Sequence, residues 1–394
     1  MIKRILFRNF YSFEEETEVS FEVGKKPTNS TYDLVSEDGS RINKVIGVIG
    51  PNGSGKTQLL KPLPFLAWFV SSSYKSSSPK DKVPLEAHKL GSDKSTYFEI
   101  EFIINGTSFR YHLEATREHV INESLYVKTS HLYSYLFIRE LKGENYEYKH
   151  KGFDFQKNVA EKIRGNASII SAAHMYDSEE ASKIVDFFES ITSNINVMGR
   201  EYYHEGALIE SASFFKDFDN YHDIAKELIC DFDLGLSSVE LMEAIGTNEK
   251  GEEEKITLPV GVHKDGDKTF ELPFFEESNG TKSTYVLLRK IIPVLENGGI
   301  AVLDEIDSDL HFHMMVKLIE LFKHKHTNPN NAQLIFSCHS HEILNVFRKH
   351  QVILTEKESL YSEAWRLDEM KGLRADDNLY AKYQAGALGA VPNI

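Results

Sequence analysis

A glycine-rich segment constrains the fold of this chain more than any other part of the sequence. Residues 50–57 read Gly-Pro-Asn-Gly-Ser-Gly-Lys-Thr and follow KVIGVI at 44–49, a β-branched run typical of a strand buried in a parallel sheet. The apolar sequence QLLKPLPFLAWFV follows and favours a helix that prolines shorten or kink. The segment fits GxxxxGK[ST] in the strand–loop–helix context that this motif requires. We therefore predict a phosphate-binding loop and not merely a flexible turn.

The chemistry of such a loop assigns a role to each position. Glycines let backbone amides approach phosphate oxygens without a Cβ in the way, and the following helix adds positive partial charge. We expect Lys56 to reach the β- and γ-phosphates and Thr57 to hold Mg²⁺, so the expected cofactors are ATP and Mg²⁺. The residues expected at the phosphates are Asn52, Gly53, Ser54, Gly55, Lys56, Thr57 and Gln58.

A second motif is the apolar strand IAVL at 300–303, which ends in Asp304 and Glu305. In an open α/β sheet, ligands bind at the carboxyl ends of the strands. We expect Asp304 to hold Mg²⁺ and Glu305 to orient or deprotonate the attacking water. The alternative is an acidic cap for the next helix, and the upstream phosphate loop disfavours it.

Two weaker motifs flank this strand. His339, in Ser-Cys-His-Ser at 337–340, follows the next apolar strand and is placed to contact a γ-phosphate, although an N-cap with an ordinary histidine is the alternative. The turn ESNGTKS at 277–283 opens a helix and can present amides to an anion. Most such turns are simple helix caps, so this motif alone predicts little.

Together, these motifs occur in the order found in ABC-type ATPases. The segments ILFRNFYSF, GPNGSGKT, ESNGTKS, VLDEIDSDLH and FSCHS resemble those of the SMC-related ABC ATPases that are not transporters. More narrowly, FEIEFIINGTSFRYHLE, VINESLY and NLYAKYQAGALGAVP resemble the RloA-type AAA-family ATPases of bacterial phage-defence and abortive-infection loci. The ATPase of PARIS-type defence systems is a related family. The resemblance covers most of the chain and is weakest over 155–260.

The resemblance implies a head-to-tail homodimer or a higher oligomer, with ATP between the phosphate loop of one subunit and the signature turn of the other. It assigns the signature contacts in trans to Ser278, Asn279 and Gly280. It also implies that Glu305 is the catalytic base and that His339 senses the γ-phosphate.

The resemblance further implies that loop 307–309 crosses the dimer interface and that Arg8 and Asn9 lie near the nucleotide. Two departures from the ABC pattern bear on these assignments. The signature turn reads SNGT instead of LSGGQ, and no glutamine occurs between Gln58 and Gln156, so no Q-loop ligand is assigned.

The expected fold class is α/β: an ABC-ATPase head with a mixed sheet flanked by helices, an antiparallel β subdomain and a helical insertion. We expect an N-terminal lobe at 1–154, a helical insertion at 155–235 and a C-terminal lobe at 236–394. The Ser/Lys-rich stretch 71–95 is expected to be a mobile loop, and helices are expected at 308–325 and from 340.

Charge and cysteine content narrow the class of protein. The chain of 394 residues carries a formal charge of -15, but 201–260 alone holds 15 acids and 4 bases. The acidity is therefore regional and fits a basic protein partner at the insertion, while nucleic acid stays possible elsewhere. Two cysteines indicate a reducing cytoplasm, and no apolar run reaches the length of a membrane span.

Three functions remain after these exclusions. The favoured one is the sensor or regulatory ATPase of an anti-phage system that controls a separately encoded effector such as a nuclease. We expect a separate effector because only 55 residues follow His339, too few for the nuclease domain of a related family. The alternatives are an SMC-like DNA-repair ATPase and an ATP-gated scaffold with negligible turnover.

Overall fold

The phosphate loop follows the central strand of a parallel core sheet. In the computed structural model, this sheet has six strands. The model describes residues 1–24, 30–36, 39–196, 198–201, 204–232, 235–247, 251, 253–308 and 310–391. Their order is β11 (Ile191–Ser193), β17 (Ile300–Leu303), β18 (Gln333–Cys338), β5 (Val45–Ile49), β19 (Val352–Glu358) and β20 (Tyr361–Arg366). Only the pairing of β19 with the edge strand β20 is antiparallel.

A second, antiparallel sheet of seven strands forms the β subdomain. Its order is β10 (Asn145–His150), β9 (Tyr133–Lys142), β8 (Val120–Lys128), β7 (Thr107–Ala115), β6 (Thr96–Ile104), β1 (Ile2–Arg8) and β2 (Thr17–Ser20). The Asn105-Gly106 turn joins β6 to β7 as the sequence predicts, with both residues at positive φ. Smaller pairs are β3 (Asp33–Val35) with β4 (Arg41–Asn43) and β12 (Ile195–Asn196) with β13 (Gly199–Arg200).

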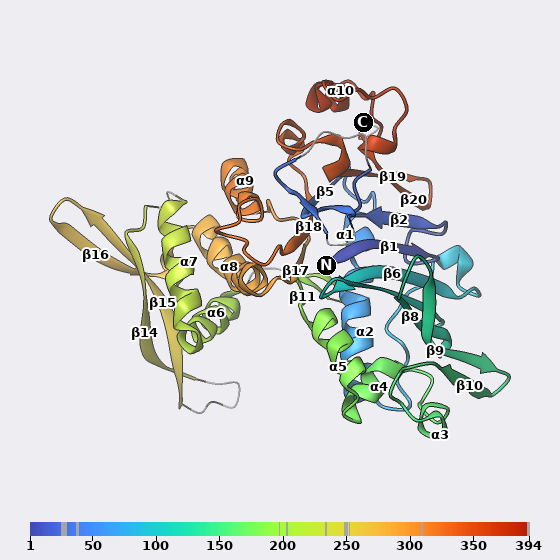
Figure 1. The fold of residues 1–394 in the computed structure, drawn as a ribbon. Coiled ribbons are helices and arrows are strands. Elements are labelled where there is room, and N and C mark those ends of the chain that lie inside the picture. Colours follow the sequence, from blue (N-terminus) through green and yellow to red (C-terminus); the bar gives the residue numbers. More distant parts are fainter. Residues whose placement is uncertain are drawn as a thin grey trace.

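Helices divide between two hydrophobic cores on either side of the core sheet. Figure 1 shows the seven-stranded sheet with α2, α4 and α5 on one side, and α6–α8 with β14–β16 on the other. The first side contains α1 (Lys56–Leu60), α2 (Pro62–Ser76), α3 (Lys157–Ala160), α4 (Ile169–Met175) and α5 (Glu179–Glu189). The second side contains α6 (Glu205–Asp217), α7 (Asp219–Asp231), α8 (Asn279–Asn297) and α9 (Phe312–Glu320), with β14 (Ser238–Thr247), β15 (Glu253–Asp265) and β16 (Lys268–Pro273).

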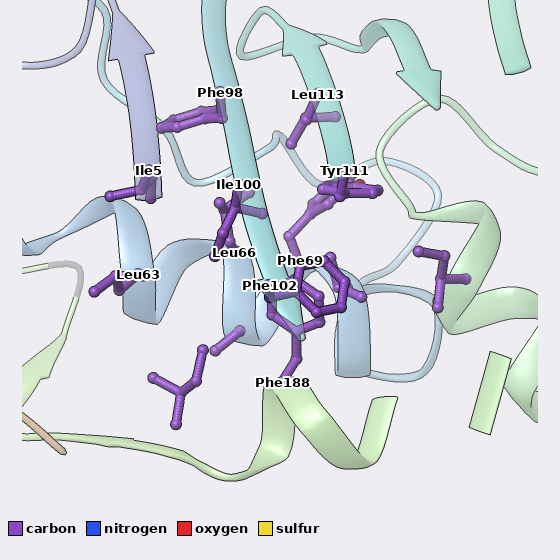
Figure 2. Close-up of a cluster of buried hydrophobic side chains, with 14 of the residues drawn as sticks. Ile5, Leu63, Leu66, Phe69, Phe98, Ile100, Phe102, Tyr111, Leu113 and Phe188 are labelled. Carbon is purple, nitrogen blue, oxygen red and sulfur yellow. The ribbon is translucent and has the colours of Figure 1, made fainter. Parts of the chain in front are cut away.

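The first core forms where α2 packs against β6. Alternate residues Phe98, Ile100 and Phe102 of β6 point toward α2, whose Leu66 and Phe69 meet them (Figure 2). The ring of Phe102 stacks on Phe187 of α5 at 4.5 Å between centroids, and these side chains are fully or almost fully buried. This packing fixes α2, which comes directly after α1 and the phosphate loop.

These sheets and helices confirm the expected α/β class with a mixed sheet and an antiparallel β subdomain. The helices of the expected insertion at 155–235 divide between the two cores, with α4 and α5 in the first and α6 and α7 in the second. Between them β11 joins the core sheet as a parallel strand beside β17. Two sheet faces need cover, and the helices of 155–235 are shared between them.

The prediction of a mobile loop at 71–95 is also wrong. The first six of these residues continue α2, and Val83 and Leu85 are buried. Arg164 donates to the main-chain carbonyls of Ser73 and Ser77 and thereby binds this stretch to the segment before α4. The Ser/Lys-rich composition of this stretch gave no sign of the hydrogen bonds that the Arg164 guanidinium donates to its main-chain carbonyls.

Helices in the C-terminal lobe are shorter than expected. α9 covers only part of 308–325, and the segment after His339 forms a 3₁₀ turn, His341–Asn345. Further 3₁₀ turns are Lys89–Gly91, Phe274–Glu276, Lys349–Gln351 and Leu367–Glu369, and α10 (Leu379–Gln384) is the last helix described. Among the helices of the described residues, none is long and apolar enough to cross a membrane.

Candidate functional site

The phosphate loop has the conformation that its sequence predicts. Gly53 and Gly55 have φ of +77° and +105°, values that disfavour residues with a Cβ. A Cβ on Gly55 would lie 2.7 Å from Ser362 Oγ, so β20 also excludes a side chain here. The Ser54 hydroxyl is 2.6 Å from Thr355 Oγ1 of β19 and ties the loop to the core sheet. Asn52, at the start of the loop, is exposed.

Lys56 lies under the loop that it is expected to serve. Its ammonium donates to the carbonyls of Gly50 at 2.8 Å and Pro51 at 3.1 Å. Burial lowers the pKa of Lys56, although the charges of Asp304 and Glu305 act in the opposite direction. The Lys56 ammonium thus faces a cradle of main-chain atoms with the two acids of the next motif nearby.

Thr57 and Asp304 meet although 247 residues separate them. Thr57 Oγ1 donates to Asp304 Oδ2 at 2.6 Å, and the other carboxylate oxygen accepts from Ser337. Asp304 is 1% exposed. A hydroxyl and a carboxylate in contact beside a glycine-rich loop are the donor set of a Mg²⁺ site, so these residues fit the cofactors expected from the sequence.

Asn194 fixes the main chain of Asp304 from the end of β11. Its amide nitrogen donates to Asp304 O at 3.0 Å, and its amide oxygen accepts from Asp304 N at 2.7 Å. Asn194 is buried, so both main-chain groups depend on this one side chain. Sequence reasoning missed it, because β11 has only three residues and no periodic pattern marks where it ends.

Glu305 lies between three donors of its own chain. Its Oε1 is 3.2 Å from His339 Nε2, and its Oε2 accepts from Arg200 Nη1 at 2.7 Å and from Ser308 at 3.1 Å. Its main-chain amide donates to Ser337 Oγ at 2.8 Å, and its φ of +47° is uncommon for a residue with a Cβ. Burial acts to raise the pKa of Glu305, but His339, Arg200 and Ser308 together outweigh it and lower the pKa below its usual value.

Asp307 joins the loop after β17 to the loop after β18. Its carboxylate accepts from the amides of His339 at 3.0 Å and Ser340 at 2.8 Å, and from Ser340 Oγ at 2.8 Å. Its side chain therefore holds the two loops together within one chain. The expected contact of this loop across a dimer interface stays a prediction. Asp309, which belongs to the same prediction, lies outside the described residues.

Gln58 and Asn9 both make hydrogen bonds within the chain. The amide oxygen of Gln58 accepts from Ser12 N at 3.1 Å and from the Ser12 hydroxyl. The Asn9 amide donates to the carbonyls of Gly91, Lys94 and Ser95, and its oxygen accepts from His88 N. The Asn9 amide thus holds the segment around the 3₁₀ turn at Lys89–Gly91. Its expected place near the nucleotide stays a prediction.

Arg8 is exposed, and its guanidinium lies 6.0 Å from the centre of the Tyr97 ring. In this N-terminal segment, it is Ser12 that contacts the helix after the phosphate loop: besides Gln58, its hydroxyl contacts Ser362 Oγ at 2.6 Å. A tight turn, with Asn9 and Tyr11 at positive φ, reverses the chain after β1. The expected place of Arg8 near the nucleotide also stays a prediction.

The signature turn lies in the other lobe. Ser278 is the N-cap of α8 and accepts from Thr281 N at 3.1 Å, the alternative that the sequence left open. Ser278 and Asn279 are exposed, and Gly280 is half-buried. Figure 1 shows α8 in the lobe that also holds α6, α7 and β14–β16. The turn is thus presented on the surface, with the sequence and helix start that were predicted.

The motif residues therefore converge from four strands of one sheet. Lys56 and Thr57 follow β5, Asp304 and Glu305 follow β17, His339 follows β18, and Asn194 follows β11. Sequence reasoning missed Arg200 because it comes from a hairpin strand of only two residues. Ser337 belongs to the motif Ser-Cys-His-Ser at 337–340, but no role was assigned to it. Its position near the end of a buried strand could have indicated that it lies in the site.

Known proteins that resemble this chain include a protein family and a solved structure. A family model described as "AAA domain, putative AbiEii toxin, Type IV TA system" matches residues 45–345, a span from β5 to the turn after His339. The chain is also similar in structure to an SMC head solved in complex with the C-terminal winged-helix domain of ScpA. The sequence identity is 12%, the TM-score is 0.49, and the match covers 93% of this chain and 99% of that one. None of the curated proteins matches.

The family model spans well over half of the chain and contains the phosphate loop, both acids and the histidine. The chain therefore belongs to the AAA-domain family described as putative AbiEii toxin of type IV toxin–antitoxin systems.

Proposed function

We propose that this chain is a Mg²⁺-dependent ATPase that hydrolyses ATP to ADP and phosphate. The observation that carries the proposal is the contact of Thr57 with Asp304, with Glu305 next in sequence and His339 at 3.2 Å from it. Thr57 and Asp304 would hold Mg²⁺, and Lys56 would bind the terminal phosphates. The bound ion would supply charge stabilisation to the transferring phosphoryl group.

In this proposal the protein's own chemistry is to orient a water and accept its proton. Glu305 is the general base, and its carboxylate is half-exposed, which leaves it accessible to water. His339 stands on the other side of that carboxylate and is placed to contact the γ-phosphate. Asp307 fixes the His339 backbone, so the histidine and the acid keep their relative position.

We further propose that the active form is a head-to-tail homodimer. The exposed signature turn Ser278–Gly280 would complete the nucleotide site of a second copy, as the resemblance to ABC ATPases implies. The N-terminus of α8, a helix of 19 residues, provides the positive end of a dipole for a phosphate. ATP binding would then set the oligomeric state.

The biological role that we propose is the sensor or regulatory subunit of an anti-phage system. The name of the family includes a toxin of a type IV toxin–antitoxin system, and the sequence resembles ATPases of abortive-infection loci. The effector that we propose it controls is a separate polypeptide such as a nuclease. An SMC-like role on DNA is the competing proposal.

Two variants test the ATPase. Lys56→Ala should lose ATP binding with an unchanged circular dichroism spectrum, and unchanged affinity would contradict the phosphate-loop assignment. Glu305→Gln should bind MgATP and form the dimer in light scattering, yet release no phosphate. If this variant hydrolyses ATP normally, Glu305 is not the base. If the wild type forms the dimer with ATP but shows no turnover either, the chain is an ATP-gated scaffold.

A plaque assay separates the two biological roles. Cells that carry the chain with its neighbouring gene should restrict phage growth, and Lys56→Ala should abolish the restriction. Loss of resistance to DNA damage without any effect on plaques would favour the DNA-repair role.

A further inference from the structure

Glu305 makes one contact that the proposed reaction does not use. Arg200 Nη1 donates to Glu305 Oε2 at 2.7 Å and also to Ser308 Oγ, which itself donates to the same carboxylate oxygen. The Arg200 side chain is 14% exposed and that of Glu305 is 31% exposed, so the pair is only partly screened by water. A charge-assisted hydrogen bond of this length is stronger than a neutral one.

This contact turns the carboxylate toward its own chain. Oε2 accepts from two donors and Oε1 faces His339. A general base must accept a hydrogen bond from the water that it deprotonates, so geometry decides whether it can act. While Arg200 is in this position, Glu305 Oε2 accepts from Arg200 and Ser308 and is not available to a water molecule.

Residues on either side of the β12–β13 hairpin, which carries Arg200, contact helix α8 through Lys290. Lys290 Nζ donates to Ser193 O at 3.0 Å and to Glu201 at 3.3 Å. The same helix α8 starts at the signature turn. A shift of α8 would therefore be transmitted to the strand that carries Arg200.

A cleft beside the ion pair gives Arg200 room to leave. It has a volume of about 310 Å³ and is lined by Arg200 and Glu305 together with Val286 and Leu287 of α8 and Ala207 of α6. Glu305 itself has a positive φ, a conformation that persists only where the surroundings hold it. The acid and the arginine thus share a space in which both side chains can change position.

We propose that Arg200 is a positioning residue that restrains Glu305, and that hydrolysis requires Arg200 to release the carboxylate to the attacking water. The inference rests on the proposed ATPase function and adds a control residue to it. Without the Arg200 guanidinium, the Glu305 carboxylate would be free to turn, and the binding of MgATP would not change. The restraint therefore acts on kcat and not on KM.

The test compares the full-length wild type with Arg200→Gln and Arg200→Lys in steady-state hydrolysis of MgATP. Arg200→Gln should raise kcat about tenfold, the size expected when one partly screened charge-assisted hydrogen bond is lost, with KM unchanged. Arg200→Lys keeps a cation beside Glu305 and should restore the low rate. A fall or no change in kcat for Arg200→Gln overturns the inference, as does an Arg200→Lys variant as fast as Arg200→Gln.

Arg289→Gln is the matched control, because Arg289 lines the same cleft but pairs with Glu210 at 2.9 Å. Its kcat should equal that of the wild type. If Arg289→Gln accelerates hydrolysis as much as Arg200→Gln does, the effect comes from the charge of the cleft and the inference fails. Thermal unfolding verifies that each variant is folded.

Glu305→Gln, alone and with Arg200→Gln, separates the inference from the proposed function. If Glu305→Gln still hydrolyses ATP, the proposed function fails. If it abolishes hydrolysis in both backgrounds while Arg200→Gln alone is no faster than the wild type, only the restraint fails.

Discussion

Thr57 Oγ1 donates a hydrogen bond of 2.6 Å to Asp304 Oδ2, which joins the helix after the phosphate loop to the end of β17. The two residues reach each other because β5 and β17 flank β18 in one parallel sheet, so their carboxyl ends open on the same edge. The contact puts a hydroxyl and a carboxylate where a hard divalent cation has its preferred oxygen ligands.

Removal of the Thr57 hydroxyl should therefore weaken the use of Mg²⁺. We expect Thr57→Ala to need at least about tenfold more Mg²⁺ for half-maximal ATP hydrolysis, a loss typical of a changed metal environment. Thr57→Ser keeps the hydroxyl and should titrate like the wild type. The measurement is phosphate release against Mg²⁺ at fixed ATP. Identical Mg²⁺ curves for the Ala and Ser variants would show that Thr57 is not a ligand.

Asn194→Ala should impair both stability and hydrolysis. The change leaves the buried N–H and C=O of Asp304 without partners, which costs about 1–3 kcal/mol of unfolding free energy. Because the Asp304 backbone also positions Glu305, we expect kcat to fall more than ATP affinity does. Urea unfolding and single-turnover hydrolysis measure the two effects. Asn122→Ala, in a half-buried position of β8, is the control that should alter neither.

The sequence alone was sufficient for the part of the site that depends on strand order. Lys56, Asp304, Glu305 and His339 each follow a long apolar strand, and parallel strands bring such ends together. Their gathering at one edge of the core sheet was therefore predictable from pattern and topology.

The residues that hold these four were not predictable in the same way. Asn194 follows a strand of three residues and Arg200 lies in a strand of two, and both strands are too short for any periodicity to appear. The local structure around Asn9 and in the stretch 71–95 was missed for a related reason. Their conformation depends on hydrogen bonds to main-chain carbonyls far away in the sequence, and composition does not record such partners.

A buried ion pair in the β subdomain should be important for folding. Arg139 and Glu123 are fully buried 3.6 Å apart, and Glu123 also accepts from Tyr111, Ser168 and the amide of Ile169. Arg139→Met would leave this carboxylate without its cation, and loss of one partner of a buried pair costs about 3–5 kcal/mol.

The urea midpoint of Arg139→Met should therefore fall far below that of the wild type. Arg110→Met is the control, because Arg110 contacts Glu101 from a side chain that is 30% exposed, and its loss should cost about 1 kcal/mol or less. Equal midpoints for the two variants would show that the buried pair does not contribute as we expect.

The acid stability of the β subdomain should depend on Glu99. Burial acts to raise the pKa of Glu99, but the hydrogen bond from His112 and the charge of Arg4 outweigh it and lower the pKa from 4.5 to about 2. A carboxyl whose pKa is lower in the folded state stabilises the protein above its unfolded pKa. This stabilisation should be complete above about pH 5 and lost as the pH falls toward 2. Glu99→Gln should be less stable than the wild type at pH 6, with the difference in urea midpoint shrinking between pH 4.5 and the lowest pH at which the protein stays folded. A difference that does not vary with pH over this range would mean that packing, and not charge, accounts for the role of Glu99.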